Sequence, residues 1–403
     1  MISIEEAQRI ILQHLAPLPT EEVPLLQGLG RVAGENVYAP RDIPAADNSA
    51  MDGYAFASGT LRGNRVAVSG IVPAGTEMTS PVAAGEAVKI MTGASIPPGC
   101  DTVVPLEHVE RIGDTIRLLG GVKPGSHIRK RGEDICAGQL AIAAYSPLRP
   151  QEIGMLASLG KSSVSVYHRP TVGVLATGDE LLEIGSAPSP GKIVNSNSVS
   201  IAAQVMESGG NPVLLGIARD DMETTKNRIR AGIRGDLLVT TGGVSVGDRD
   251  CVKEAIVELG GRVLFWKVNV KPGKPVAFAV LSGKPIIALP GNPVAAMISF
   301  EMFVRPGLLR MMGHTHLFRP SVRATLIEPV ANKGDRPHLV RVLVTARKEG
   351  YAVSTTGNQS SARLSSITAA NGFMRIAPGT TMVPGASVDV YLLDRPVELE
   401  VLP

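Results

Sequence analysis

The sequence predicts a multidomain fold in which an α/β part with a mostly parallel sheet is combined with two β-rich parts. Between residues 171 and 312, apolar strand-like runs alternate with helical segments, the order that produces a parallel sheet. From about 47 to 140, and again after Arg319, short β-type runs are separated by Gly and Pro turns, as in small β modules and barrels. At 403 residues the chain is also too long for one ordinary core.

Short sequence patterns predict the individual helices and strands along the chain. Ser3 and Glu6 have the spacing of a capping box, so a first helix is predicted to run to about residue 15. RVAVSGIV and EAVKIM are expected strands, and PQEIGMLASLG is an expected helix. In the α/β part we expect strands at TVGVLA, PVLLGIA, DLLVT and RVLFWKV, and helices that begin near Asn197, Met222, Asp250 and Pro293. SVRATLIEPV, LVRVLVTA, MRIAPG and SVDVYLL then predict a C-terminal β-barrel or sandwich.

Composition excludes several classes of function. The 40 basic and 37 acidic residues leave a net charge of only +3, and aromatic residues make up 3%, so nucleic acid is not an expected partner. No run approaches the roughly 18 apolar residues of a membrane helix, and the start MISIEEAQRIIL lacks the features of a signal peptide. Cys100, Cys136 and Cys251 indicate neither a disulfide framework nor a thiolate metal site. We therefore expect a cytoplasmic protein that binds no membrane.

Acidic side chains follow three predicted strands of the α/β part. They lie in TGDELL, ARDD and TTGGVSVGDRD, and are Asp179, Glu180, Asp220, Asp221, Asp248 and Asp250. Ligands collect at the carboxyl ends of parallel strands, and carboxylates that converge there repel one another unless a cation is present. In the third loop, Gly242 and Gly243 let the backbone approach a ligand closely. The loops therefore predict a Mg²⁺ ion that bridges to phosphate oxygens.

Basic side chains supply the opposite charge. KVNVKPGKPV contains Lys267, Lys271 and Lys274, and lysines act as point charges for oxyanions. The LPGNP loop, 289–293, adds backbone N–H groups next to a predicted helix N-terminus, where anions bind readily. Together with the acidic loops, these segments predict a site for a metal, a phosphoanhydride and a second oxyanion.

Each of these features also has a simpler explanation. Asp179, Asp220 and Asp250 can each be a helix N-cap or a surface charge, and the lysines can be a solvated surface. The Gly pair can serve only a tight turn. Their joint placement at one edge of one sheet favours a site. The seven histidines have no metal-site spacing, and the sequence has no nucleophile elbow, Walker loop or dinucleotide fingerprint.

Seven motifs together resemble the molybdopterin molybdenumtransferases, the family of MoeA and of the E domain of gephyrin. The motifs are PRDIPAADNSAMDGYA (40–55), IMTGASIPPGCDTVVP (90–105), TGDEL, IVNSNS (193–198), TTGGVSVGDRD, KPGKP and LPGNPVAA. They extend over nearly the whole chain, and their number and order argue against chance agreement.

The resemblance implies an elongated four-part subunit of a homodimer. On this basis we expect an N-terminal helix and linker segment at 1–46, a β-rich inserted domain at 47–140 and the return of the linker domain at 141–170. A Mog-like three-layer α/β/α domain that binds molybdopterin is expected at 171–317, and a C-terminal β-barrel at 318–403. The implied reaction takes adenylylated molybdopterin and molybdate, gives molybdenum cofactor and AMP, and needs Mg²⁺ or a similar ion. The preceding adenylyltransferase and the molybdoenzymes that accept the cofactor are further expected partners.

The resemblance also assigns site residues. The expected catalytic residues are Asp52 in AMDGYA, Thr92 in IMTG, Glu180, Asp250, Lys267 and Lys271. Mg²⁺ is expected on Glu180, Asp248 and Asp250. The expected substrate-binding residues are Asp220, Asp221, Gly242, Gly243, Ser245, Lys274, Pro290, Gly291, Asn292, Arg341, Ser360 and Ser361. Because the pterin dithiolene supplies the sulfurs that ligate molybdenum, the protein need not contribute Cys or His ligands.

Three alternatives remain at this point. A molybdopterin adenylyltransferase would use the same α/β part, but such proteins tend to carry TGGTG where this chain has TGGVS, and they lack the β-rich parts. A CinA-like pyrophosphatase or amidase shares TGDEL and NSNS but not AADNSAMDGYA. A scaffold would bind a partner peptide, as the gephyrin E domain does. The complete set of acids and lysines favours catalysis.

Overall fold

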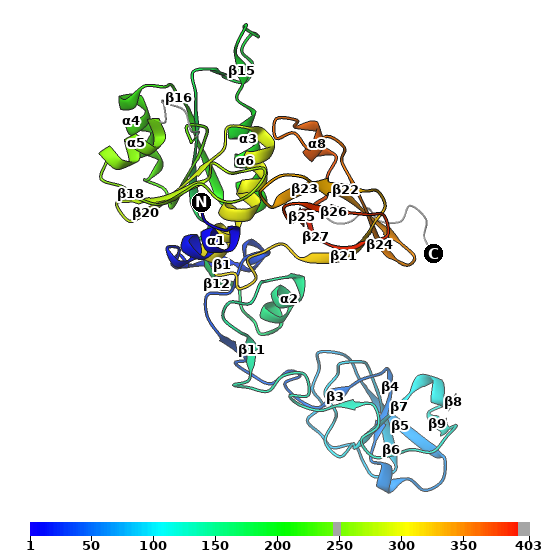
Figure 1. The fold of residues 1–403 in the computed structure, drawn as a ribbon. Coiled ribbons are helices and arrows are strands. Elements are labelled where there is room, and N and C mark those ends of the chain that lie inside the picture. Colours follow the sequence, from blue (N-terminus) through cyan, green and yellow to red (C-terminus); the bar gives the residue numbers. More distant parts are fainter. Residues whose placement is uncertain (245–250, 394–403) are drawn as a thin grey trace. The chain divides into compact units, whose positions relative to one another are not determined.

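The computed structural model describes residues 1–244 and 251–393, which fall into two compact units (Figure 1). One unit contains Val23–Leu29 and Glu35–Val164. The other contains Met1–Glu22, Gly30–Gly34 and Ser165–Pro403. The predicted Ser245, Asp248 and Asp250 lie outside the described residues. No helix in the described ranges is long and apolar enough to cross a membrane.

A six-stranded sheet forms the centre of the smaller unit. Its order is β7-β4-β6-β5-β9-β8, in which β5 and β6 are parallel and the other neighbours are antiparallel. The strands are β4 (Gly53–Phe56), β5 (Arg65–Val72), β6 (Glu86–Ile90), β7 (Thr102–Pro105), β8 (Val109–Ile112) and β9 (Thr115–Leu118). Tyr54, Phe56 and Ile116 are buried between its faces and the covering loops. Two antiparallel ribbons and a helix complete the unit: β2 (Val37–Tyr38) with β11 (Leu140–Ile142), β3 (Asn48–Ser49) with β10 (Ile128–Arg129), and α2 (Pro150–Ser158).

The larger unit begins with α1 (Ile4–Gln13), which the Ser3 hydroxyl caps by accepting a hydrogen bond from Glu6 N at 3.0 Å. The helix start predicted at Ser3 is therefore confirmed. Ile4, Ala7 and Ile11 are buried in the core of the α/β part.

The α/β part is built on a second six-stranded sheet in the order β16-β13-β17-β20-β19-β18. The strands are β13 (Thr171–Thr177), β16 (Asn211–Ala218), β17 (Leu237–Thr241), β18 (Arg262–Trp266), β19 (Ala277–Leu281) and β20 (Lys284–Leu289). The first four in the sheet order are parallel, whereas β19 is antiparallel to both of its neighbours. The mostly parallel sheet is thus confirmed. β19 reverses because it forms a hairpin with β20 through a turn at Ser282 and Gly283, both with positive φ.

Helices cover both faces of this sheet, which gives three layers (Figure 1). Alternate residues of each strand point to opposite faces. Thus Leu237 and Val239 pack with α1, α3 and α6, whereas Leu238 packs with α4 and α5. The helices are α3 (Ser196–Glu207), α4 (Met222–Gly232), α5 (Cys251–Glu258) and α6 (Pro293–Ser299), and α6 continues through a π-helical turn (Phe300–Val304) into α7 (Arg305–Met311). Burial on both faces explains why the central strands β13, β17 and β20 read as continuous apolar runs.

The predicted C-terminal barrel is confirmed as a closed five-stranded barrel in the order β21-β24-β23-β25-β27. Its strands are β21 (Ser321–Leu326), β23 (His338–Arg347), β24 (Gly350–Thr355), β25 (Gly372–Ile376) and β27 (Ser387–Leu392). Leu326, Val342 and Val353 lie in its core. The other short elements of the chain are β1 (Thr20–Pro24), β12 (Ser163–Tyr167), β14 (Leu181–Leu182), β15 (Ile193–Val194), β22 (Val330–Asn332), β26 (Thr380–Met382) and α8 (Ser365–Thr368).

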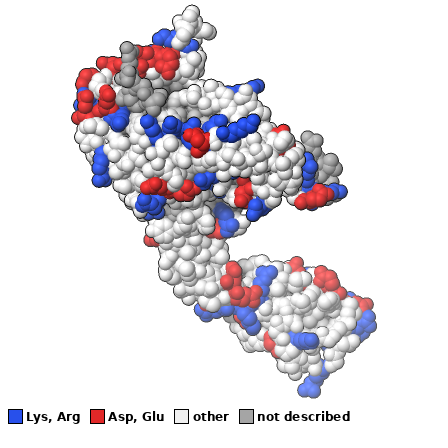
Figure 2. All heavy atoms as spheres, viewed as in Figure 1, with Lys and Arg blue, Asp and Glu red and all other residues white. Residues whose placement is uncertain are grey.

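Charged side chains are unevenly distributed over the larger unit. In the view of Figure 2, acidic side chains gather over the side of the α/β part where α4 and α5 lie, and a run of basic side chains extends toward the barrel.

Candidate active site

A cavity of about 1020 Å³ lies at the carboxyl ends of β13, β17 and β20. Most of its wall comes from the loops that follow these strands, and the barrel adds a small part. Seven of the site residues predicted from the sequence line it: Glu180, Asp220, Gly242, Gly243, Pro290, Gly291 and Asn292. Ala362 and Leu364 are the contribution of the barrel. We call this space the acidic cavity.

Gly178 allows Glu180 to reach the acidic cavity. Gly178 has φ +140°, and a Cβ on it would collide with both carboxylate oxygens of Glu180. The Glu180 side chain therefore folds back over the end of β13, in space that only a glycine leaves open. Asp179 Oδ1 accepts a hydrogen bond from Asp220 N at 3.1 Å, so it holds the neighbouring acidic loop.

Gly242 and Gly243 pack closely against the end of β13 and the start of α5. A Cβ on Gly242 would lie 2.5 Å from Thr177 O, and one on Gly243 would lie 2.6 Å from Val252 Cγ2. Both residues also have positive φ, at +87° and +62°. Only glycine therefore fits this backbone, which runs along the wall of the acidic cavity.

A second cavity, of about 610 Å³, adjoins the first and has Pro275, Pro290 and Asn292 in common with it. Its charged and hydroxyl-bearing lining residues are Lys271, Lys274, Arg336, Ser360 and Ser361. We call it the basic cavity. Lys271 is attached to the barrel through its backbone, since Lys271 N donates to Pro337 O at 2.9 Å and Leu339 N donates to Lys271 O at 2.7 Å. The α/β part and the barrel thus build the basic cavity together.

The buried Arg341 supports the barrel loop that lines the basic cavity. Its Nε donates to Ser366 Oγ at 3.0 Å and its Nη2 to Ser360 O at 3.3 Å. Burial lowers the pKa of this guanidinium. Nearby, burial and the charges of Lys271 and Arg341 lower the pKa of His338 to about 4, so its imidazole is neutral at physiological pH. Lys271 and Arg341 thus place positive charge beside His338, next to the basic cavity.

The LPGNP loop connects the two cavities to the barrel. Val294 N, in the first turn of α6, donates to Ser361 O at 3.1 Å, and Asn292 Nδ2 donates to Ser361 Oγ at 3.1 Å. On the other side, Asn197 Nδ2 donates to Gly291 O at 2.8 Å. The N–H group of Val294, which directly follows the predicted LPGNP loop, is therefore already bonded to the barrel.

Four other predicted residues are not among those that line these cavities, and two of the four belong to the smaller unit. Lys267 follows β18 with φ +87° and is not among the residues that line either cavity. Asp221 caps α4, because its Oδ2 accepts a hydrogen bond from Thr224 N at 2.7 Å. Asp52 and Thr92 belong to the smaller unit, where Asp52 Oδ1 accepts hydrogen bonds from Thr92 N and Oγ1.

Sequence reasoning missed several residues that the structure brings to the site. Asn197 lies in the IVNSNS motif, so a signal existed for it. Arg336 and Asn358 also line the basic cavity. Asn358 lies two residues before the predicted Ser360, whereas nothing in the sequence context of Arg336 distinguishes it from a surface residue. Asn358 is close to Ser361, where the barrel packs on the LPGNP loop, and Arg336 is close to His338, where the barrel pairs with Lys271.

We tested whether the acidic cavity fits a metal ion. Within 1–244 and 251–393, no group of three or more His, Cys, Asp or Glu side chains is close enough to hold one. Glu180 and Asp220 both line the cavity, and carboxylate oxygens are the ligands that Mg²⁺ prefers. A site that keeps several waters and adds phosphate oxygens needs only one or two carboxylates from the protein. The described residues are compatible with such a site.

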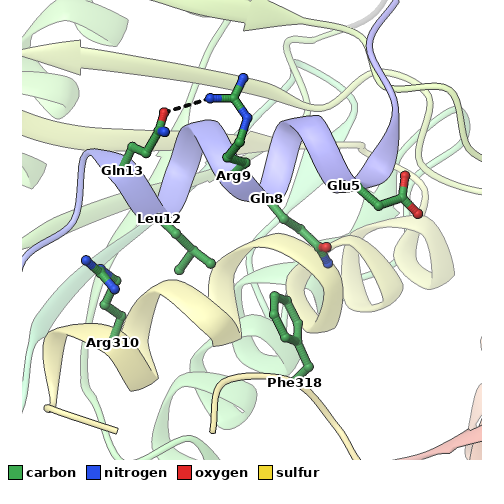
Figure 3. A pocket seen from close by; sticks show the side chains of 7 residues that line it. All are labelled: Glu5, Gln8, Arg9, Leu12, Gln13, Arg310 and Phe318. Carbon is green, nitrogen blue, oxygen red and sulfur yellow. Dashed lines mark hydrogen bonds between the residues drawn. The ribbon is translucent and has the colours of Figure 1, made fainter. Parts of the chain in front are cut away.

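A smaller cavity, of about 390 Å³, lies beside α1 and contains none of the predicted residues (Figure 3). Glu5, Gln8, Arg9, Leu12 and Gln13 reach it from α1, and Arg310 and Phe318 face them.

Comparisons with known proteins agree with this architecture. The family model of the MoeA N-terminal region (domain I and II) matches residues 2–160, that of a "probable molybdopterin binding domain" matches 173–310, and that of the MoeA C-terminal region (domain IV) matches 323–393. The three regions, in this order, define a protein of the MoeA type.

Individual relatives extend over most of the chain. Molybdopterin molybdenumtransferase 2 of Mycobacterium tuberculosis is 35% identical over 388 residues, which cover 93% of this chain and 95% of the relative. The molybdopterin molybdenumtransferase of Haemophilus influenzae is 37% identical over 324 residues, 79% and 80% of the two chains. The crystal structure of the molybdopterin biosynthesis moeA protein from Pyrococcus horikoshii has a TM-score of 0.83 at 30% identity and covers 97% and 100%. The chain belongs to the molybdopterin molybdenumtransferase family, which confirms the predicted resemblance and fold and favours neither the adenylyltransferase nor the scaffold.

Proposed function

We propose that this chain is a molybdopterin molybdenumtransferase that inserts molybdenum from molybdate into adenylylated molybdopterin and releases AMP. The observation that supports this best is the pair of adjoining cavities of opposite character. One is lined by Glu180 and Asp220, and the other by Lys271, Lys274 and Arg336. The reaction needs a nucleotide phosphoanhydride and a separate oxyanion next to each other, and this arrangement provides a place for each.

The acidic cavity is the proposed site of the pterin nucleotide. Its volume is at the upper end of the roughly 300–1,000 Å³ that small-molecule sites occupy, as a ligand of this size requires. Glu180 and Asp220 would hold Mg²⁺ there, together with Asp248 and Asp250 as the resemblance implies. When bound, Mg²⁺ neutralises charge that develops on the phosphoanhydride. Gly242 and Gly243 leave backbone exposed to the phosphates.

The basic cavity is the proposed site of molybdate, a tetrahedral dianion. Lys271, Lys274 and Arg336 offer positive charge, and the Ser360 and Ser361 hydroxyls can donate hydrogen bonds. Burial accounts for most of the low pKa of the neighbouring His338, and the charges of Lys271 and Arg341 lower it further. Positive charge would hold molybdate in the basic cavity, and the acidic cavity would hold the nucleotide.

The remaining expectations from the resemblance are part of the same proposal. We expect the enzyme to act as a homodimer in the cytoplasm, with Asp52, Thr92 and Lys267 as catalytic residues. The adenylyltransferase of the preceding step supplies the nucleotide substrate, and molybdoenzymes accept the product.

Equilibrium titration tests the assignment of the two cavities. AMP with Mg²⁺ and molybdate should each bind the wild-type protein in the presence of the other. Lys271→Gln should weaken molybdate binding more than AMP binding. Lys348→Gln, in the exposed turn between β23 and β24, is the matched control and should change neither. Competition between AMP and molybdate for one site, or equal loss of both affinities in Lys271→Gln, would refute the assignment.

A further inference from the structure

Arg219 holds the turn that carries Glu180. Its Nη1 donates hydrogen bonds to Asp179 O at 3.1 Å and to Leu181 O at 2.9 Å, the carbonyls of the residues on either side of Glu180. Lys192 Nζ donates to the same Asp179 carbonyl at 2.7 Å. Hydrogen bonds from a charged donor are roughly twice as strong as neutral ones. Two cationic side chains therefore hold the carbonyl before Glu180, and Arg219 also holds the carbonyl of the residue after it.

The segment that contains Arg219 is itself tied to this turn. Gly178 N donates to Ala218 O at 3.1 Å, and Asp220 N donates to Asp179 Oδ1 at 3.1 Å. Arg219 thus lies between two further contacts that join the end of β16 to the end of β13. The loops after these two strands form one connected structure, and it presents the carboxylates of Glu180 and Asp220 to the acidic cavity.

Arg219 does not line the acidic cavity, so it does not contact a ligand there. Its bonds to Asp179 and Leu181 end on main-chain oxygens, and they leave the charge of the Glu180 carboxylate available to a ligand. An arginine suits this task because its planar guanidinium stays charged and bridges two acceptors from one rigid group.

We propose that Arg219 is a positioning residue that sets the orientation of Glu180 toward a divalent cation bound with the nucleotide in the acidic cavity. This inference rests on the proposed function. A residue that orients a metal ligand from behind typically changes metal affinity or activity by about 10- to 100-fold when it is replaced.

Replacement of Arg219 in the full-length protein tests the inference. Arg219→Gln removes the charge and the bridging guanidinium, and Arg219→Lys keeps only the charge. Arg230→Gln is the matched control, because Arg230 is an exposed arginine of α4 whose Nη1 donates to Asn227 of the same helix, at 2.8 Å. Mn²⁺ binding in the presence of AMP is followed by electron paramagnetic resonance, and backbone mobility at 178–182 by hydrogen exchange.

Arg219→Gln should weaken Mn²⁺ binding about tenfold or more and speed exchange at 178–182. Its Tm should stay close to that of Arg230→Gln, and Arg219→Lys should restore part of the affinity. In turnover, the concentration of Mg²⁺ needed should rise more than kcat falls. If Arg219→Gln does not fold, Arg219→Lys is compared with Arg230→Gln by the same two measurements.

The inference is overturned if the Arg219 variants match Arg230→Gln in both Mn²⁺ affinity and exchange, or if the wild-type protein binds no Mn²⁺ beside AMP. It is also overturned if Mn²⁺ affinity falls without any change in exchange at 178–182. A wild-type protein that releases no AMP from adenylylated molybdopterin would refute the proposed function instead, and the binding and exchange measurements on Arg219 would still stand.

Discussion

Asp52 and Thr92, 40 residues apart in the sequence, are joined by two hydrogen bonds to a single carboxylate oxygen. Asp52 Oδ1 accepts from Thr92 N at 2.7 Å and from Thr92 Oγ1 at 2.9 Å. These bonds hold the pKa of the Asp52 carboxyl below its usual value, and the bond from the backbone N–H has the larger effect. The two residues assigned by the resemblance in the smaller unit are thus one structural pair.

Thr92→Val should raise the pKa of Asp52 part of the way toward its ordinary value, because it removes the hydroxyl donor and keeps the backbone donor. If ionised Asp52 is required for turnover, the acid limb of the pH profile should move to higher pH. Carboxyl ¹³C NMR and the pH profile of AMP release measure the two effects. Thr76→Val is the control, since its hydroxyl donates only to Pro73 O in an exposed turn. An unchanged Asp52 pKa would contradict the pairing.

Gly178→Ala should lower turnover strongly while the protein stays folded. The added Cβ would displace the Glu180 carboxylate, and a non-Gly residue held in a sparsely populated backbone region costs about 1–3 kcal/mol. Gly260→Ala separates the two effects, because Gly260 has φ +85° with no atom near a Cβ and lies away from both cavities. Turnover in Gly178→Ala no lower than in Gly260→Ala would show that Glu180 need not occupy its present position.

Asp221 and Glu180 should respond in opposite ways to replacement. The hydrogen bonds from Thr224 lower the pKa of Asp221, so its folded-state pKa lies below the unfolded one. Its stabilisation is then present above the unfolded pKa and is lost as the pH falls through the folded pKa. Asp221→Ala should therefore lower Tm at neutral pH, with a difference from wild type that disappears in acid, and leave turnover largely intact. Glu180→Gln should instead lower turnover and leave Tm largely unchanged.

Thermal melts across pH, combined with turnover assays, distinguish these two roles. A large loss of turnover in Asp221→Ala at unchanged Tm would assign Asp221 to the substrate and not to the helix cap.

The sequence predicted the α/β part well, because its elements depend on local periodicity. Helix starts predicted near Asn197, Met222 and Pro293 lie within one residue of α3, α4 and α6 in the structure. The hairpin of β19 with β20 was not predicted. Apolar runs do not reveal strand direction, and the reversal depends on positive φ at Ser282 and Gly283.

The site was predicted less completely, since it combines segments that are far apart in the sequence. Loops that follow parallel strands meet at one edge, so Glu180, Asp220 and the Gly pair could be placed together. Arg336 and Lys271 share a cavity only because β23 of the barrel pairs with the KPGKP segment, a contact that has no local signal. Asp221 was predicted to bind substrate, but its carboxylate accepts a hydrogen bond from Thr224 N and so caps α4.

The central claim is that the two cavities carry out one reaction on two substrates. AMP release from adenylylated molybdopterin measures it most directly, with molybdate and Mg²⁺ each present or omitted. The account predicts rapid release only when both are present, and loss of release with EDTA that added Mg²⁺ restores. Release that is equally fast without molybdate or with EDTA, or formation of adenylylated molybdopterin from ATP, would contradict it.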